Sequence, residues 1–313
     1  MIIVTGGAGF IGSNLVKILN DQGENKIIIV DNIGKTNKFL NLNKLKFIDY
    51  FDKETFLTNF KHFKEVKTIF HEGACSVTTE LDGNYMIKNN YVFSKELLDI
   101  ALINKSDFIY ASSASVYGDG KNGFKEEPQY EYPLNVYAFS KLMFDNHVRN
   151  IFKHEKNLPI QITGLRYFNV FGYQENHKGN MASVIFHFYN QRKNNEAIKL
   201  FEGSEKYLRD FIFIEDVINV NMFFYEKKIN GIYNCGTGKA RSFYDMASIF
   251  KDTIPNTQIK IIPFPDNLKG KYQAYKKADV ENLKKCGYQK SFLSLKEGVK
   301  KYLDKLTSTN GFF

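Results

Sequence analysis

Residues 2–31, IIVTGGAGFIGSNLVKILNDQGENKIIIVD, contain the pattern that decides the fold. An apolar run, 2–5, is followed by a glycine-rich turn, and residues 10–21 then show the apolar spacing of an amphipathic helix. A second apolar run, 26–30, ends at the acidic residue Asp31. A strand, a tight turn, a helix and a second strand in this order predict a β–α–β unit with parallel strands.

The same alternation of apolar runs and helical patterns continues as far as about residue 168. Further strands are expected at 45–48, 66–71, 108–112 and 160–167, and further helices at 82–103 and 136–156. These strands are apolar at nearly every position, which is typical of strands that are covered on both faces. The sequence therefore predicts the α/β class, with a Rossmann-type doubly wound parallel sheet between two layers of helices.

Beyond this point the sequence loses its regular alternation. A glycine-rich and polar segment, 169–180, precedes a helical pattern and several short apolar runs, among them 211–214. We therefore expect two lobes with the active site between them. The larger, dinucleotide-binding lobe is predicted to comprise 1–168 and 210–236, and the smaller α/β substrate-binding lobe 169–209 and 237–313.

Three equally spaced glycines, Gly6, Gly9 and Gly12, lie where the first strand turns into the first helix. Residues without bulky side chains let the backbone approach a pyrophosphate, and the helix begins with free N–H groups that can bind it. Asp31, at the end of the next strand, can accept a hydrogen bond from a ribose hydroxyl. Together these residues predict a site for a nicotinamide dinucleotide.

The choice between NAD and NADP depends on charge. Asp31 favours NAD, because its carboxylate repels the 2′-phosphate of NADP. Lys35, Lys38 and Lys53 lie nearby in the sequence and could neutralise that phosphate. The residues alone leave both cofactors open.

A tyrosine and a lysine four residues apart, Tyr137 and Lys141, occur in the predicted helix 136–156. This spacing places them on one face of the helix, so we expect the ammonium group to lower the pKa of the tyrosine. The tyrosine can then take the proton of an alcohol while hydride leaves for the nicotinamide. Ser113 follows the strand 108–112 at its carboxyl end, where it can hold the substrate hydroxyl.

The glycine spacing, the serine-rich strand end and the Tyr–Lys pair occur in one order, and in this the sequence resembles the extended short-chain dehydrogenase/reductase family. Members of that family that dehydrate sugars carry an acidic pair beside the serine. Ser113 is instead flanked by Ser112 and Ala114. The resemblance therefore favours a redox epimerase that acts on a nucleotide sugar.

A closer resemblance, to the ADP-L-glycero-D-manno-heptose 6-epimerase family, extends over almost the whole chain. The runs that carry it are MIIVTGGAGFIGSN (1–14), FHEGACSVTTE (70–80), LRYFNVFG (165–172), HKGNMASVIFH (177–187), LFEGSE (200–205), RDFIFIEDV (209–217) and PFPDNLKGKYQAY (263–275). It implies conversion of ADP-D-glycero-D-manno-heptose to its C6 epimer by transient oxidation. The implied cofactor is a tightly bound NADP, with NAD as the alternative.

The resemblance also implies roles for individual residues. The positions that match its cofactor residues are Phe10, Ile11, Asp31, Asn32, Lys38, Lys53, Glu72, Gly73, Ala74, Cys75, Ser76, Asn89, Lys141 and Val170. Those that match its substrate residues are Asn169, Asn180, His187, Phe201, Glu202, Gly203, Ser204, Arg209 and Tyr272, with Asn180 where a serine is usual. Tyr137 and Lys178 match the two acid/base residues, and Ser113 the catalytic serine.

Two alternatives remain open at this point. One is a different nucleotide-sugar epimerase or reductase of the same extended family. The other is a non-catalytic protein that senses a dinucleotide, although such proteins commonly lose the tyrosine or lysine that this chain keeps. Turnover measured on a panel of nucleotide sugars distinguishes these two alternatives from the heptose epimerase.

Composition limits the expected partners. The net charge is +9, but the basic residues are mostly scattered lysines, so we expect a solvated surface and no nucleic-acid partner. Cys75, Cys235 and Cys286 lack metal-ligand spacing, and no metal site is predicted. No apolar run is long enough for a membrane span. The resemblance implies a cytoplasmic homo-oligomer, with a pentamer as the expected assembly.

Overall fold

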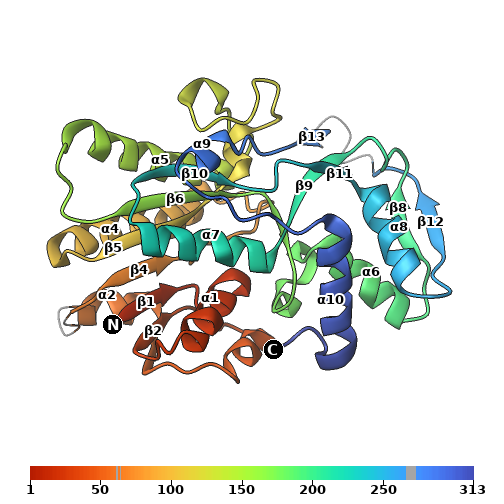
Figure 1. Cartoon of the computed structure of the whole chain (residues 1–313), viewed down its shortest axis with the longest axis horizontal. Coiled ribbons are helices and arrows are strands. Elements are labelled where there is room, and N and C mark those ends of the chain that lie inside the picture. Colours follow the sequence, from red (N-terminus) through yellow and green to blue (C-terminus); the bar gives the residue numbers. More distant parts are fainter. Residues whose placement is uncertain (61–62, 64, 266–272) are drawn as a thin grey trace.

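Within the residues that the structure describes, seven parallel strands form the central sheet (Figure 1). This computed structural model describes residues 1–60, 63, 65–265 and 273–313. The strand order is β10–β6–β5–β4–β1–β2–β3. The strands are β1 (Ile2–Thr5), β2 (Ile27–Val30), β3 (Asp49–Phe51), β4 (Thr68–His71), β5 (Asp107–Ser113), β6 (Ile162–Tyr167) and β10 (Gly231–Cys235). The predicted Rossmann-type sheet is confirmed.

Alternate residues of the strands enter two separate buried clusters. Ile2 and Val4 of β1 pack in one cluster with side chains of α1 and α7, whereas Ile3 belongs to a second cluster with α2, α4 and α5. These helices are α1 (Phe10–Asp21), α2 (Lys53–Asn59), α4 (Phe93–Asn104), α5 (Val136–His154) and α7 (Ile214–Lys227). Helices therefore cover both faces, which explains why the strands are apolar at nearly every position.

A smaller lobe lies at the right of the view in Figure 1. Its first sheet has the order β11–β9–β13, with β7 also paired to β9, and its second joins β12 to β8. The strands are β7 (Asn169–Phe171), β8 (Ile198–Phe201), β9 (Leu208–Phe213), β11 (Ala240–Ser242), β12 (Ile259–Ile262) and β13 (Tyr275–Lys276). The helices are α6 (Val184–Lys193), α8 (Phe243–Thr253) and α10 (Leu295–Thr309), whereas the short α9 (Glu281–Lys285) lies beside β10 of the central sheet in Figure 1.

Two predicted elements of the larger lobe differ in the structure. The strand expected at 45–48 is wrong, because the backbone N–H of Lys46 bonds to the side chain of Asn20 and β3 begins only at Asp49. The helix expected at 82–103 is divided into α3 (Gly83–Ile87) and α4 by a π-helical turn, η3 (Lys88–Val92).

The sequence pattern also missed structure in the second half of the chain. Helices α7 and α8 were not predicted, and segment 169–180 contains both β7 and a 3₁₀ turn, η6 (Asn176–Met181). The lobe boundaries stay a proposal. Residue 210 falls inside β9, which pairs with β7, whereas β10 of segment 210–236 joins the central sheet.

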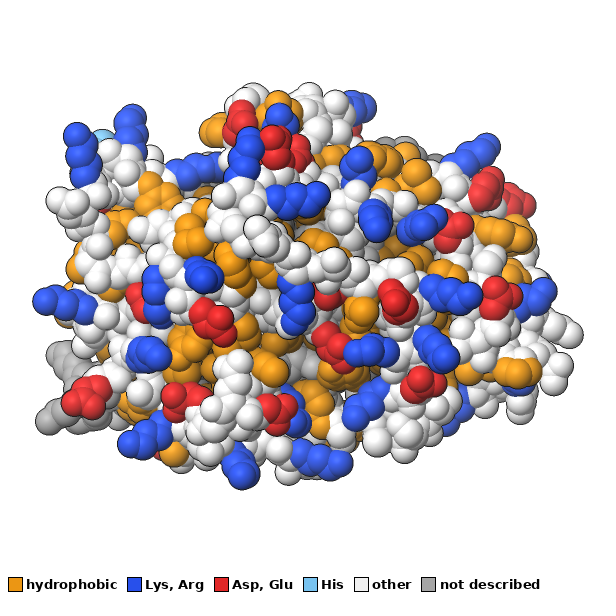
Figure 2. Space-filling model, viewed as in Figure 1, with side chains coloured by type: hydrophobic (Ala, Val, Ile, Leu, Met, Phe, Trp, Pro, Cys, Tyr) orange, Lys and Arg blue, Asp and Glu red, His pale blue; other side chains and the backbone are white. Residues whose placement is uncertain are grey.

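Basic side chains are scattered over the face drawn in Figure 2, where they alternate with acidic ones instead of forming one patch. Among the described residues, no helix is both long and apolar enough to cross a membrane.

Candidate active site

The turn between β1 and α1 leaves no space for side chains at two of its glycines. A Cβ on Gly12 would lie 2.2 Å from the carbonyl oxygen of Gly6, and a Cβ on Gly6 would lie 2.7 Å from the backbone nitrogen of Gly73. Gly6 also has a φ of +67°, which residues with a side chain rarely adopt. Gly9, the N-cap of α1, offers no side-chain cap, so the first N–H groups of the helix remain available for a pyrophosphate.

A cavity of about 290 Å³ lies beside this turn. Most of the predicted cofactor residues line it: Gly6, Gly9, Phe10, Ile11, Gly12, Asp31, Lys38, Glu72, Gly73, Ala74, Ser76, Lys141 and Val170. Asn32, Lys53, Cys75 and Asn89 do not line it. The crowded glycines, the uncapped helix start and the acidic residue of β2 together fit a nicotinamide dinucleotide.

The carboxylate of Asp31 is held by three donors. Its Oδ2 accepts a 2.9 Å hydrogen bond from the N–H of Ala8, and its Oδ1 accepts one of 2.6 Å from the N–H of Asn32. The amine of Lys38 forms an ion pair with the same Oδ1. Because Lys38 offsets the charge of Asp31, a second anionic group at this position meets less repulsion than Asp31 alone would produce.

The predicted cofactor residues outside the cavity lining have other contacts. Lys53 donates a hydrogen bond to Oδ1 of Asn89, so these two residues contact each other. Asn90, in the π-helical turn η3, holds the backbone of Cys75 through hydrogen bonds of 2.8 and 3.0 Å. Sequence reasoning missed Asn90. The feature of the sequence that could have revealed it is a polar residue at a buried position of a helical pattern.

Tyr137, Lys141 and Ser113 come together at the carboxyl end of β5. The side chain of Asn135 caps α5, which places Tyr137 and Lys141 in its first two turns. Ser113 and Tyr137 line the same two cavities, and the hydroxyl of Ser113 acts to lower the pKa of Tyr137. The amine of Lys141 donates a 2.8 Å hydrogen bond to the carbonyl oxygen of Ala111.

Burial has the largest effect on the pKa values of the ionisable side chains at this end of β5. It raises the pKa of Tyr137, and the hydroxyl of Ser113 opposes this only in part, so the direction is opposite to the one expected from the sequence. Burial lowers the pKa of Lys141 to about 8, against the opposing charges of Glu72 and Asp145. It also raises the pKa of Glu72 to about 7. Lys141 and Glu72 can therefore exchange protons near neutral pH.

A larger cavity, of about 670 Å³, opens on the other side of Tyr137 towards the smaller lobe. The two cavities share five lining residues: Ser113, Tyr137, Phe168, Val170 and Lys178. The predicted serine and both predicted acid/base residues therefore lie where the cavities meet. Such a junction lets one molecule in each cavity approach the same proton-transfer groups.

The predicted substrate residues divide between this lining and its surroundings. Those that line the larger cavity are Asn169, Asn180, His187, Phe201 and Ser204. Glu202, Gly203 and Arg209 do not line it, and Tyr272 lies outside the described residues. Among the described lining residues there is no Asp or Glu.

Arg209 stands in a row of cations across the smaller lobe. It is buried on β9, where its guanidinium donates 2.9 Å to the carbonyl of Leu208 and lies 5.7 Å from the ring centre of Phe243. Arg241 on β11 and Lys276 on β13 are its register partners, so all three side chains emerge on one face of the sheet. Burial and the charge of Arg209 lower the pKa of Lys276 to about 7.

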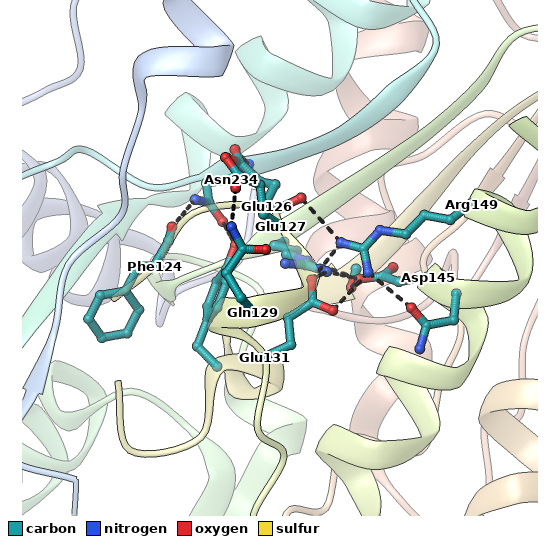
Figure 3. A network of polar contacts seen from close by, with 12 residues as sticks. Phe124, Glu126, Glu127, Gln129, Glu131, Asp145, Arg149 and Asn234 are labelled. Atoms are coloured by element: carbon teal, nitrogen blue, oxygen red, sulfur yellow. Dashed lines mark hydrogen bonds and ion pairs between the residues drawn. The ribbon is translucent and has the colours of Figure 1, made fainter. Parts of the chain in front are cut away.

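Behind Ser113 lies a buried polar network that the sequence did not reveal (Figure 3). Asp145 of α5 accepts hydrogen bonds from Tyr110 and Ser112 of β5, each 2.9 Å long, and one of 2.9 Å from Arg166 of β6. Arg166 also donates to Glu131, which Figure 3 shows beside Arg149. The network fixes the end of β5 against α5.

In the part of the chain that the structure describes, no group of three or more His, Cys, Asp or Glu side chains is placed to hold a metal ion. The candidate site therefore consists of the glycine turn, the two cavities and the proton-transfer groups between them.

Comparison with known proteins agrees with this geometry. Residues 2–236 match the model of the NAD dependent epimerase/dehydratase family, and the chain belongs to that family. It is 54% identical, over 100% of its own length and 99% of the relative, to the ADP-L-glycero-D-manno-heptose-6-epimerase of Brachyspira hyodysenteriae.

Two solved structures extend the comparison. The ADP-L-glycero-D-manno-heptose-6-epimerase of Helicobacter pylori has a TM-score of 0.86 and 32% identity, covering 98% of this chain and 96% of that one. The UDP-N-acetylglucosamine 4-epimerase of Methanobrevibacter ruminantium has a TM-score of 0.84 and 26% identity, covering 98% of both chains. The whole chain, including the smaller lobe, thus has the fold of these epimerases.

Proposed function

We propose that this protein is an isomerase that converts ADP-D-glycero-D-manno-heptose to ADP-L-glycero-D-manno-heptose by inverting C6 of the heptose. The 54% identity to a heptose 6-epimerase over the full chain supports the substrate. The junction of the two cavities at Ser113, Tyr137 and Lys178 carries the chemistry, because inversion needs two proton-transfer groups beside one cofactor.

The hydrogen on C6 is not acidic, so direct deprotonation would be far too slow. A bound nicotinamide supplies a hydride acceptor that can return the same hydride to the opposite face. The residues that would hold it are those of the glycine turn and of the smaller cavity. The ion pair of Lys38 with Asp31 favours NADP over NAD.

Tyr137 and Lys178 have complementary roles in this proposal. One accepts the proton of the C6 hydroxyl during oxidation, and the other delivers a proton to the oxygen after the opposite face has been reduced. Two groups are needed because the hydroxyl points in opposite directions in the two epimers. Ser113 holds the reacting oxygen, and Lys141 supports the cofactor ribose beside Tyr137.

The larger cavity would bind the nucleotide sugar. Asn169, Asn180 and His187 would offer polar groups to the heptose, and Phe201 and Ser204 would border the nucleotide. The row formed by Arg209, Arg241 and Lys276 supports a diphosphate site in the smaller lobe, because guanidinium and ammonium groups bind phosphate oxygens, although none of the three lines this cavity. The lack of a carboxylate among the described lining residues favours epimerisation over dehydration.

The finer expectations stay part of the proposal. These are the two lobes with the boundaries given above, a cytoplasmic location and a homo-oligomer with a pentamer as its assembly. Light scattering of the purified protein measures the assembly directly.

Turnover in D₂O tests the redox mechanism. If the same hydride leaves and returns, the epimerised product carries protium at C6, because solvent never exchanges with that position. Mass spectrometry of the product measures this. Deuterium at C6 would show deprotonation of carbon and overturn the proposed chemistry, while no epimer at all would overturn the proposed substrate.

A further inference from the structure

One buried carboxylate holds both ends of the segment that carries Lys178. Glu175 is completely buried. Its Oε2 accepts a 2.7 Å hydrogen bond from the N–H of Ser183, and its Oε1 accepts 2.5 Å from the hydroxyl of Ser183 and 2.9 Å from the hydroxyl of Tyr302. Two of these hydrogen bonds close the segment from Glu175 to Ser183 into a loop, and the third ties the loop to Tyr302.

These contacts connect three elements around the cavity junction. Glu175 is the residue before η6, Ser183 is the N-cap of α6, and Tyr302 belongs to α10. Within the loop, Gly179 adopts a φ of +53° that interrupts the helical turn after Lys178. The carboxylate thus fixes where the loop begins, where it ends and how it rests on the last helix.

The same carboxylate faces the amine of Lys178. Nζ of Lys178 lies 3.9 Å from Oε2 of Glu175 and 4.9 Å from the ring centre of Phe10. The amine is thus placed between a negative charge and an aromatic face, both of which favour its protonated form.

Other titratable groups near Lys178 cannot replace this charge. The neighbouring groups are His177, Lys38 across the smaller cavity, Tyr137 at the junction, Lys199 in the larger cavity, and Tyr302 behind Glu175. The described lining of the smaller cavity has two carboxyl groups, those of Asp31 and Glu72, and they are bonded to Lys38 and Tyr167 respectively. Glu175 is therefore the carboxylate that acts directly on Lys178.

We infer that Glu175 is a positioning residue that keeps Lys178 protonated and holds it at the junction of the two cavities. Its use in proton transfer rests on the proposed function, whereas the charge effect does not. Burial lowers the pKa of Lys178, and the charge of Glu175 opposes that decrease. Removing the charge should consequently lower the pKa of Lys178 further.

Competitive labelling of lysines with trace acetic anhydride measures this without a substrate. The protein is used as purified, and mass spectrometry follows acetylation of Lys178 against pH, with the exposed Lys46 as internal reference. In Glu175→Gln the midpoint for Lys178 should fall by about one pH unit or more. An unchanged midpoint in a folded Glu175→Gln protein would overturn the inference.

Two further variants separate charge from structure. Glu215→Gln is the matched control, since Glu215 also joins a tyrosine, Tyr173 at 3.2 Å, to a lysine, Lys301 at 2.6 Å. It should leave the midpoint of Lys178 unchanged. Ser183→Ala loosens the loop but keeps the charge, so the midpoint should stay near that of the wild type. A shift as large as that of Glu175→Gln would show that loop geometry alone is responsible.

If Glu175→Gln does not fold, Glu175→Asp decides the question. The shorter side chain withdraws the carboxylate, so a downward shift of the midpoint supports the inference and an unchanged midpoint contradicts it. The pH profile of turnover is measured in parallel. A wild-type protein that shows the labelling pattern but no epimerisation would overturn the proposed function and leave the charge effect of Glu175 standing.

Discussion

The hydroxyl of Ser112 donates a 2.9 Å hydrogen bond to Oδ2 of Asp145, which joins the end of β5 to helix α5. The same oxygen accepts from Arg166, whose side chain is completely buried. Ser113 is the next residue after Ser112, and Asp145 lies one helical turn beyond Lys141. The relative position of the proposed serine and lysine therefore depends on a charge pair that water does not reach.

Replacing one member of this pair should destabilise the whole protein. In Asp145→Asn the buried guanidinium of Arg166 loses one of its two carboxylate partners and keeps only Glu131. Loss of a partner from a buried ion pair costs up to about 3–5 kcal/mol. Urea unfolding followed by circular dichroism measures the free energy of unfolding. The control is Asp119→Asn, because Asp119 pairs with Lys121 at the surface. Equal stability of the two variants would contradict the assigned role of the network.

The last residue of β4, His71, and the residue that follows it, Glu72, should give opposite pH dependences of stability. Burial lowers the pKa of His71 to about 3 from 6.5, so its unfolded form binds an extra proton and stability is lost as pH falls below about 6.5. Burial raises the pKa of Glu72 from 4.5 to about 7, so its folded form binds the extra proton and stability is gained as pH falls from 7 to 4.5.

Single substitutions should reveal these opposite contributions to the pH dependence of stability. Compared with the wild type, His71→Asn should lose less stability between pH 7 and 5, and Glu72→Gln should lose more, each by up to about 1.4 kcal/mol per pH unit. Unfolding free energies at three pH values give the slopes. Parallel slopes for all three proteins would contradict the assigned pKa directions.

Cofactor choice should depend on Lys38. Removing its amine in Lys38→Ala leaves the charge of Asp31 without an ion-pair partner, so affinity for NADPH should fall about tenfold or more while affinity for NADH changes little. Fluorescence titration of the cofactor-free protein provides both dissociation constants. Lys46→Ala, an exposed lysine in the same region, is the control. A similar loss for both cofactors would mean that Lys38 does not contact the 2′-phosphate.

The proton-transfer role proposed for Tyr137 predicts a large loss of activity when its hydroxyl is removed. Tyr137→Phe removes only the hydroxyl and should lower kcat by about 10²–10⁴, since general acid/base groups contribute factors of this size. Tyr132→Phe, at an exposed position, should have no effect. Cofactor content is measured by absorbance in each preparation, so that a catalytic loss is distinguished from a loss of cofactor. A Tyr137→Phe enzyme within threefold of the wild type would remove the tyrosine from the mechanism.

Local patterns predicted the parts of the fold that depend on local spacing. Helix α1 begins at Phe10 and ends at Asp21, as its apolar spacing indicated, because strand, glycine turn and helix follow one another directly. The third strand was displaced to Asp49 since the side chain of Asn20, distant in sequence, binds the preceding backbone. Such a contact leaves no signal in the periodicity of 45–48.

In the candidate site, too, the sequence predicted only the relationships that depend on local spacing. Tyr137 and Lys141 could be paired from their helical spacing, but burial shifts the pKa of both, and that of Lys141 also depends on Glu72, which follows β4. Asn90, Asp145 and Glu175 were missed for a similar reason. Each is a polar residue whose partners come from distant segments, so only the folded chain reveals what it holds.

The central claim is tested most directly by proton NMR of the purified protein with ADP-D-glycero-D-manno-heptose and no added cofactor. Signals of the C6 epimer should appear and approach an equilibrium mixture, because the cofactor stays bound and is regenerated in every cycle. No epimer, even after NADP and NAD are added separately, would contradict the heptose assignment.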